Sequence, residues 1–322
     1  MCISNWFFEK ERDNFIIMRK KYPLSELLRK SAIYLYCLPL GIDRDIKNNI
    51  WREKYKAKLE KYIGKPILTD EWKKKEEKKY IFTAWLQGEN NAPVLVKKCL
   101  ESISAYKNEY ELVIITKKNV LEYIEIPPEI MGKWERNIIS NASFTDYVRV
   151  ALLFKYSGIW IDATVMLFDN IPNYIRETEL FFFQQSFLDH QAIGISSWFI
   201  SSKYVNNPVV GGIKMSLENY WNDNDYQSDY YLFHDMVSIM SGREEYRDYW
   251  NRIPYYNNVN PHVLQHELKT EYSLTRFSQI TKMSPIQKLT YKINIGDNEK
   301  DVLHFLLKEG RFSDEGTNSF NS

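Results

Sequence analysis

Residues 141–164 read NASFTDYVRVALLFKYSGIWIDAT, and this stretch predicts a helix followed by a buried strand. The helix is expected over 143–156, because apolar side chains recur there at helical spacing, Ser143 is a suitable N-terminal cap and Gly158 follows the last turn. The strand is expected over 159–167, IWIDATVML, which is almost continuously apolar. A helix that leads straight into a buried strand is typical of α/β proteins.

Three charged side chains of this stretch are candidates for a site. Asp146 and Arg149 lie three residues apart, so on a helix they are within reach of each other. An ordinary surface ion pair is the alternative interpretation. Asp162 follows the apolar residues 159–161, so its carboxylate must either be buried and paired or face a cleft. A cleft is expected, because ligands of open α/β sheets bind at the carboxyl ends of strands, and Asp162 would hold Mg²⁺ or Mn²⁺ there.

From residue 80 onward, short apolar runs alternate with helical segments. Strand, helix and strand in this order predict right-handed crossover units and a mainly parallel sheet. The further predicted strands cover residues 80–85, 111–116, 181–185 and 197–201. The further predicted helices cover residues 93–106, 208–221 and 229–241. The final third of the chain is rich in Tyr, Asn and His, and we expect helices and loops there that close over the site.

Residues 1–79 differ from the rest in being polar and helical. Their apolar side chains at helical spacing are Trp51, Tyr55, Leu59, Tyr62 and Ile63. We therefore expect an N-terminal helical region over 1–79 and a main domain over 80–322. The run KKKEEKKY at 73–80 mixes both signs of charge, which favours a solvated linker over a patch that binds anionic lipid.

The composition excludes several classes of protein. The chain has 322 residues and a net charge of +1, from 43 basic against 42 acidic side chains, so a nucleic-acid partner is not expected. Three widely spaced cysteines favour reduced thiols in the cytoplasm. No signal-peptide pattern and no membrane span is expected. The sequence lacks three well-known motifs, namely the phosphate-binding loop of NTPases, the dinucleotide-binding fingerprint and the nucleophile elbow of serine hydrolases.

Four segments together resemble a known family. The order D-Y-x-R, an apolar helix and K-Y-S-G-I-W-I-D-A-T over 146–164 is similar to the capsular polysaccharide synthesis proteins and to the wider DXD sugar transferases, including the family 32-like glycosyltransferases. Their typical pattern is D-Y-x-R-x-x-x-L-x-x-x-G-G-x-Y-x-D-x-D. AWLQG at 84–88, DYYLFHDM at 229–236 and SPIQKLTYK at 284–292 resemble further segments of the family. The resemblance implies a GT-A-type, Rossmann-like α/β fold, with a mixed, mainly parallel sheet flanked by helices and an added N-terminal helical region.

Carried onto this chain residue by residue, the resemblance implies three sets of site residues. The set that contacts the base, ribose, sugar and phosphates of a donor is Trp85, Gln87, Asp146, Arg149 and Lys288. The set near the transferred sugar, expected to be catalytic, is Asp229 and His234. The set for a Mn²⁺ or Mg²⁺ cofactor is Asp162 and Thr164. Trp85 alone is equally well interpreted as a core aromatic.

The chain departs from the family pattern at two positions. Thr164 stands where the second Asp of D-x-D is usual, so a metal would be held there through a hydroxyl or a water, or would be bound only weakly. Ser157 stands before Gly158 where a second Gly is usual.

The function implied by the resemblance is that of a metal-dependent, retaining hexosyltransferase. It would move a sugar from a nucleotide-diphosphate sugar, with UDP as the expected nucleotide, to a glycan acceptor in capsular polysaccharide synthesis. A lipid-linked oligosaccharide acceptor would bring this cytoplasmic protein to the inner face of the plasma membrane. Two alternatives remain: a nucleotide-sugar or glycan-binding protein without catalysis, and a structural partner in an assembly complex that works through its N-terminal helices. The oligomeric state is not determined by the sequence.

Overall fold

The computed structural model describes residues 23–37, 44–70, 72–73, 78–186, 194–227 and 229–309. A five-stranded sheet with the order β2-β1-β3-β6-β5 lies at the centre. Its strands are β1 (Tyr80–Ala84), β2 (Glu111–Ile115), β3 (Gly158–Ile161), β5 (Leu180–Gln184) and β6 (Ile195–Ser202). β1 pairs in parallel with β2 and β3, whereas β6 runs antiparallel to β3 and β5. The predicted mixed, mainly parallel α/β sheet is confirmed.

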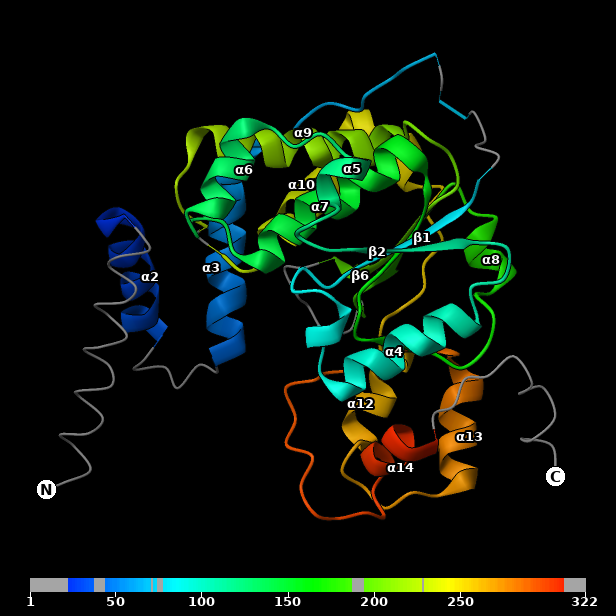
Figure 1. The fold of residues 1–322 in the computed structure, drawn as a ribbon. Helices are drawn as coiled ribbons and strands as arrows, with labels where there is room; N and C mark the ends of the chain where they lie inside the picture. Colours follow the sequence, from blue (N-terminus) through cyan, green and yellow to red (C-terminus); the bar gives the residue numbers. More distant parts are fainter. Residues whose placement is uncertain are drawn as a thin grey trace, which may run out of the picture.

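Alternate residues of the strands enter two separate hydrophobic clusters, as the period of two along a strand requires. Phe82 and Trp160 belong to a cluster with side chains of helices on one face. These helices are α3 (Arg44–Leu59), α7 (Asn141–Tyr156), α9 (Pro208–Asp223) and α10 (Leu232–Ser241). Ile81 and Ile159 belong to the cluster of the other face, which includes a small second sheet of β4 (Val165–Leu167) and β7 (Ile286–Lys288). Figure 1 shows helices above and below the central sheet.

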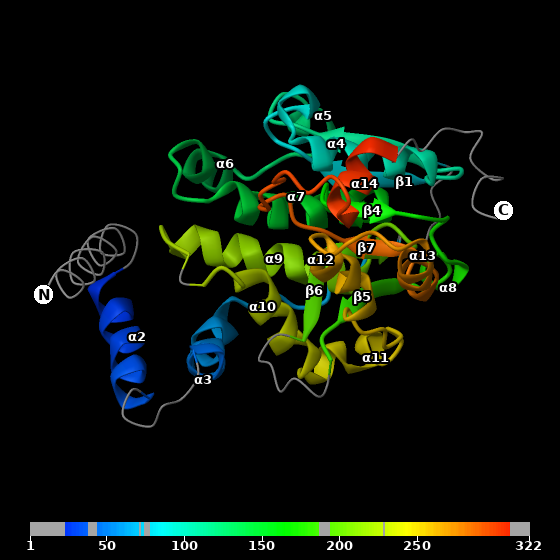
Figure 2. The same ribbon diagram turned by 90° about the horizontal axis from the view of Figure 1, so that it is seen from below.

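The C-terminal helices form a third cluster beneath α4 (Val94–Ala105). They are α12 (Val263–Glu267), α13 (Leu274–Met283) and α14 (Val302–Glu309). The remaining short helices are α5 (Val120–Tyr123), α6 (Pro128–Glu135), α8 (Asn173–Arg176) and α11 (Arg247–Trp250). Figure 2 shows β7 lying between β4 and α12, so the chain after α13 returns to pair with β4 in the second sheet.

Three boundaries differ from the prediction. The cap of α7 is Ser140, whose hydroxyl accepts a hydrogen bond from the backbone N–H of Ser143, so Ser143 is inside the helix and was the wrong cap. The strand expected over 159–167 is two strands, β3 and β4. The chain turns after Asp162, and β4 pairs in the second sheet instead of the central one. The helix expected to begin at Asp229 begins at Leu232, which leaves Asp229 in the preceding loop.

A strained turn joins α7 to β3. Ser157 has φ 58° and ψ −159°, a backbone conformation that only glycine adopts without strain. Gly158 has φ +96°, and a Cβ atom there would lie 2.3 Å from the carbonyl oxygen of Tyr80 in the neighbouring strand β1. The glycine is therefore required by the close approach of β3 to β1, and the serine before it stores strain.

The N-terminal helices are α2 (Leu24–Cys37) and α3 (Figures 1 and 2). α2 packs against α3, and its Ile33 belongs to the main hydrophobic cluster. Trp51, Tyr55 and Leu59 of α3 are buried in the same hydrophobic cluster as α7 and α10. The predicted apolar face of this region is thus confirmed. The boundary at residue 79 stays a prediction.

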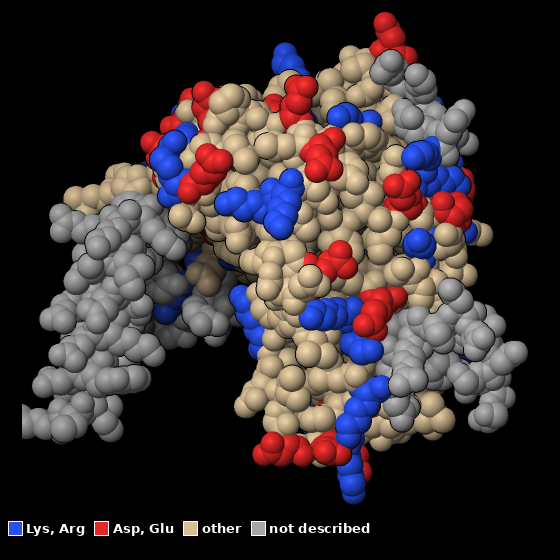
Figure 3. All heavy atoms as spheres, viewed as in Figure 1, with Lys and Arg blue, Asp and Glu red and all other residues tan. Residues whose placement is uncertain are grey.

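The surface carries both signs of charge. On the face in Figure 3, lysines and arginines are interspersed with acidic side chains, in keeping with the net charge of +1. Among the described residues, no helix combines the length and the apolar character that a bilayer span requires.

Candidate active site

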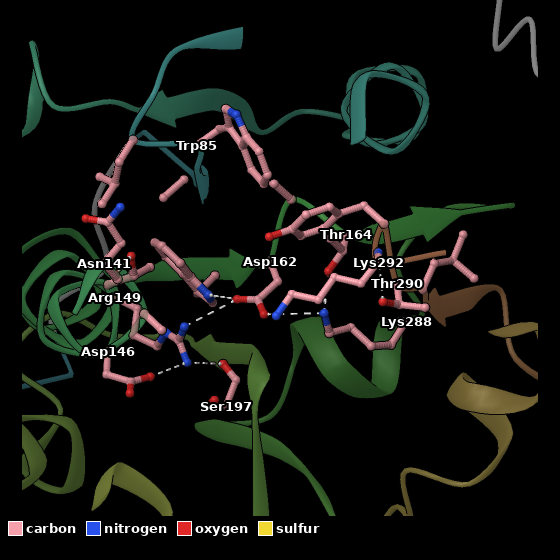
Figure 4. Close-up of a pocket in the computed structure, with 18 of the residues that line it drawn as sticks. Trp85, Asn141, Asp146, Arg149, Asp162, Thr164, Ser197, Lys288, Thr290 and Lys292 are labelled. Carbon is pink, nitrogen blue, oxygen red and sulfur yellow. Dashed lines mark hydrogen bonds and ion pairs between the residues drawn. The ribbon is translucent and has the colours of Figure 1, made fainter. Parts of the chain in front are cut away.

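A cleft with a volume of about 470 Å³ opens where β1 and β3 end and β6 begins. Parallel strands end at the same edge of a sheet, so the segments after β1 and β3 lie side by side there. The antiparallel β6 adds its first residues to this edge. Figure 4 shows the polar side chains that converge on the cleft. Those expected from the sequence are Trp85, Gln87, Asp146, Arg149, Asp162, Thr164, His234 and Lys288.

Asp146 and Arg149 form an ion pair in the wall of the cleft. Nη1 of Arg149 lies 2.8 Å from Oδ1 of Asp146, as their spacing on α7 predicted. Arg149 is only 5% exposed, because α7 packs between the sheet and α9. The alternative of an ordinary surface ion pair is therefore wrong. A buried guanidinium is stable only when several acceptors surround it, and the side chains and backbone of the cleft provide them.

Arg149 links the two carboxylates of the cleft. Besides Asp146, it donates to the backbone carbonyl of Ser197 at 3.0 Å and to Oδ1 of Asp162 at 3.4 Å. The guanidinium carbon lies 5.1 Å from the centre of the Trp160 ring, within the range of a cation–π contact. One arginine thus fixes α7, β3 and β6 relative to one another at the floor of the cleft (Figure 4).

Asp162 is held on each side by a hydrogen bond or a cation. The indole Nε1 of Trp160 donates to Oδ1 of Asp162 at 2.9 Å. The backbone N–H of Asp162 donates to the carbonyl of Trp198 at 2.8 Å. Nζ of Lys288 lies 3.6 Å from Oδ2 and also donates a hydrogen bond to the hydroxyl of Thr164. The carboxylate therefore sits between the guanidinium of Arg149 and the ammonium of Lys288.

These residues fit a divalent metal poorly. Among the described residues, no three His, Cys, Asp or Glu side chains gather as a metal site. Of the described residues that line the cleft, Asp162 is the carboxylate beside Thr164, and the Thr164 hydroxyl already accepts a hydrogen bond from Lys288. Mg²⁺ and Mn²⁺ prefer several oxygen ligands, and an ammonium stands where such an ion would approach. The expected Mn²⁺ or Mg²⁺ cofactor stays a prediction.

Burial shifts two titrations in the cleft. Burial raises the pKa of Asp146 to about 6, against the lowering effect of Arg149, and the nearby charge of Asp162 also raises it. Burial lowers the pKa of His234 to about 3, helped by the positive charges of Arg149 and Arg52. His234 is thus neutral at physiological pH. Its buried Nδ1 has no hydrogen-bond partner among the described residues, and the residue lines the cleft.

Trp85 and Gln87 follow β1 and form the far wall of the cleft. The backbone N–H of Trp85 donates to the carbonyl of Ile115 at 3.0 Å, which extends the pairing of β1 with β2 by one residue. The Trp85 ring lies edge-to-face against Tyr291, with 5.5 Å between the ring centres. Trp85 therefore lines the cleft as well as packing against its neighbours. Its contact with a nucleotide stays a prediction.

Asp229 does not line the cleft. Its carboxylate pairs with Nε of Arg52 on α3 at 3.2 Å and accepts a hydrogen bond from the backbone N–H of Tyr231 at 2.9 Å. His234, five residues later, is on α10 and does reach the cleft. The two residues expected to be catalytic are thus separated, because the chain turns between them.

Several residues of the cleft were not found from the sequence. They are Asn141, Thr145, Ser197, Tyr230, Thr290 and Lys292. Asn141 and Thr145 lie four residues apart on α7, on the face that carries Asp146, so helical spacing was a usable signal. Ser197 gave no such signal, because its place depends on the antiparallel pairing of β6 with β3.

A family model of the capsular polysaccharide synthesis proteins matches residues 41–307. The chain belongs to this family. The match begins within the N-terminal helical region and includes each of the cleft residues expected from the sequence. The resemblance stated from the motifs is thereby confirmed.

Two solved structures are similar to this family member at low identity. PaToxG glycosyltransferase is 12% identical with a TM-score of 0.35, over 90% of this chain and 98% of that one. The apo form of the glycosyltransferase GlyE from Streptococcus pneumoniae TIGR4 is 8% identical with a TM-score of 0.39, over 74% of this chain and 61% of that one. No curated protein matches the chain.

Proposed function

We propose that this protein is a glycosyltransferase that moves a sugar from a nucleotide-diphosphate sugar to a hydroxyl group of a glycan during synthesis of a surface polysaccharide. The observation that carries the proposal is the convergence of Arg149, Asp162 and Lys288 at the carboxyl end of β3. Membership of the capsular polysaccharide synthesis family supplies the biological setting.

The charges of the cleft suit a diphosphate leaving group. In sugar transfer, the bond from the anomeric carbon to the diphosphate oxygen breaks, and the bond from the anomeric carbon to the acceptor oxygen forms. The acceptor hydroxyl gives up its proton, and negative charge develops on the departing diphosphate. Lys288, with Lys292 on the same segment of the rim, provides ammonium groups at the place where that charge would be stabilised.

Arg149 and Asp146 are proposed to bind and orient the donor. Arg149 has a buried Nε without a partner among the described residues, in addition to the contacts that fix it. Asp146 is proposed to accept a hydrogen bond from a sugar hydroxyl, because its carboxylate faces the cleft beside Asn141. The neutral His234 is proposed to bind the sugar through its free Nδ1.

The nucleotide is proposed to lie along the wall formed by Trp85 and Gln87. An indole face stacks on any base, and Gln87 adds hydrogen-bonding groups at the same end of the cleft. UDP is the proposed nucleotide, and transfer with retention of anomeric configuration is the proposed course. Asp229 is proposed to act on the transferred sugar only indirectly, by holding the loop before His234 through Arg52.

The acceptor is proposed to be a lipid-linked oligosaccharide at the inner face of the plasma membrane. This part rests on the family alone. A membrane-associated acceptor would be reached from the open side of the cleft, past Tyr230, whose ring is 69% exposed at the rim.

The test is calorimetric titration of the purified protein with nucleoside diphosphates and their sugars, followed by an assay of donor hydrolysis with any ligand that binds. The Asp162→Asn variant should retain its thermal melting temperature and lose turnover, because it disturbs the positions of Arg149 and Lys288. Binding without hydrolysis or transfer, with every acceptor tried, would favour the alternative of a binding protein. Absence of binding to all of these ligands would refute the proposed function.

A further inference from the structure

We propose that the ammonium group of Lys288 takes the place of the divalent metal, so that this chain binds the diphosphate of its donor without a metal ion. The inference rests on the proposed function, because it assigns the cation that stabilises the leaving diphosphate. It starts from the departure at Thr164, where the family pattern has its second Asp.

The position of Lys288 is fixed by the backbone. β7 pairs with β4 so that Lys288 lies opposite Val165, directly after the D-A-T segment. The backbone N–H of Leu289 also donates to the carbonyl of Thr164 at 2.8 Å. The two segments are thus joined at Lys288, and its side chain runs along Thr164 toward Asp162.

The ammonium occupies the place between the two side chains that would ligate a metal. Nζ of Lys288 donates to the hydroxyl of Thr164 and lies 3.6 Å from Oδ2 of Asp162. An ammonium has three N–H groups. The hydrogen bond to Thr164 uses one of them, and Asp162 attracts the group as an ion pair (Figure 4). A further N–H can donate to an oxygen of a diphosphate in the cleft.

The exchange also preserves charge. Two aspartates with a divalent ion sum to zero, and so do one aspartate with one lysine. Replacing the second Asp by Thr164 removes one negative charge, and replacing the metal by Lys288 removes one positive charge. An aspartate at 164 would instead draw the ammonium into a second ion pair. The combination of Thr at 164 and Lys at 288 is therefore self-consistent without a metal.

The first experiment measures binding of UDP, GDP and inorganic pyrophosphate by calorimetry, with EDTA and then with added Mn²⁺. The expected result is that the tightest of these ligands binds with EDTA, and that Mn²⁺ changes its Kd by less than about threefold. The Lys288→Met variant should bind about tenfold to a hundredfold more weakly, the range for a lost hydrogen bond to a charged group. Lys288→Arg should retain most of the affinity in EDTA. The control is Lys282→Met, an exposed lysine on α13 outside the cleft, which should bind as the natural protein does.

A double variant tests the same idea from the opposite direction. Thr164→Asp with Lys288→Ala recreates D-x-D and removes the ammonium, so its binding should be lost in EDTA and regained with Mn²⁺. If the natural protein binds only with Mn²⁺, the inference is overturned while the proposed function stands. If it binds in EDTA and Lys288→Met, folded by its circular dichroism, binds equally well, Lys288 is not the cation. Absence of binding in both conditions overturns the proposed function, and the inference with it.

Discussion

Replacing Arg149 by Met should destabilise the protein in a manner that depends on pH. Arg149 lowers the pKa of Asp146, which burial and the charge of Asp162 together hold at about 6. Without Arg149 this pKa rises further, and Asp146 takes up a proton. Protonating Asp146 at about pH 7.5, about 1.5 units above its pKa, costs about 2 kcal/mol of unfolding free energy, and this is the largest loss that the change at Asp146 can cause. The lost contact with the carbonyl of Ser197 adds about 1–3 kcal/mol that does not change with pH.

The sign follows from the pKa of Asp146, which lies above its unfolded value of 3.8. The folded state therefore binds the extra proton, and the folded variant recovers stability as the pH falls. Urea unfolding followed by tryptophan fluorescence should give a larger loss for Arg149→Met at about pH 7.5 than at about pH 5.5, by about 2 kcal/mol. In an Asp146→Asn background the loss should be equal at both pH values. An equal loss at both values in the natural background would refute the assigned coupling between Arg149 and Asp146.

Three further predictions concern the turn before β3 and the buried acid of α10. Ser157→Gly should raise the free energy of unfolding by about 1 kcal/mol, because glycine adopts φ 58° and ψ −159° without strain. Urea unfolding measures this, and a loss of stability would contradict the assigned strain. Gly158→Ala should lower the free energy of unfolding by about 2 kcal/mol or more, because its Cβ would lie 2.3 Å from the Tyr80 oxygen. An unchanged free energy of unfolding would show that β3 can move away from β1 without cost. Burial, with the charge of Asp229, raises the pKa of Asp235 from 3.8 to about 8, so stability falls as the pH rises toward 8. Asp235→Asn should remove about 2 kcal/mol of that fall between about pH 6 and pH 8, and a fall of unchanged size in the variant would exclude Asp235 as its source.

The elements of the fold were predictable where the local pattern and the tertiary contacts agree. Most of the apolar runs after residue 80 became strands of the central sheet, and β1, β3, β5 and β6 among them are buried on both faces. The cap at Ser140 was missed because Ser143 also has a hydroxyl, and only the hydrogen bond between them decides which one lies outside the helix. The turn after Asp162 was missed because 159–161 and 165–167 are equally apolar, although they enter different sheets.

The site was predictable to the extent that its residues belong to local motifs. Asp146, Arg149 and Asp162 come from one stretch of sequence, so helical spacing and the end of a strand were enough to bring them together. The contact of Lys288 with Thr164 spans 124 positions along the chain and depends on the pairing of β7 with β4. No local pattern specifies such a pairing, and the choice between a metal and an ammonium depends on it.

The N-terminal helical region bears on the cleft through Arg52. Arg52 on α3 holds Asp229, and Asp229 precedes the helix that delivers His234 to the cleft. The same α3 places Trp51 and Tyr55 in the main hydrophobic cluster, so removing residues 1–70 would expose that cluster and would test folding rather than activity. A single substitution at Arg52 separates the two roles, because it leaves the apolar face of α3 in place. Changed donor binding with unchanged stability in such a variant would mean that α3 positions the loop before α10 as well as completing the core.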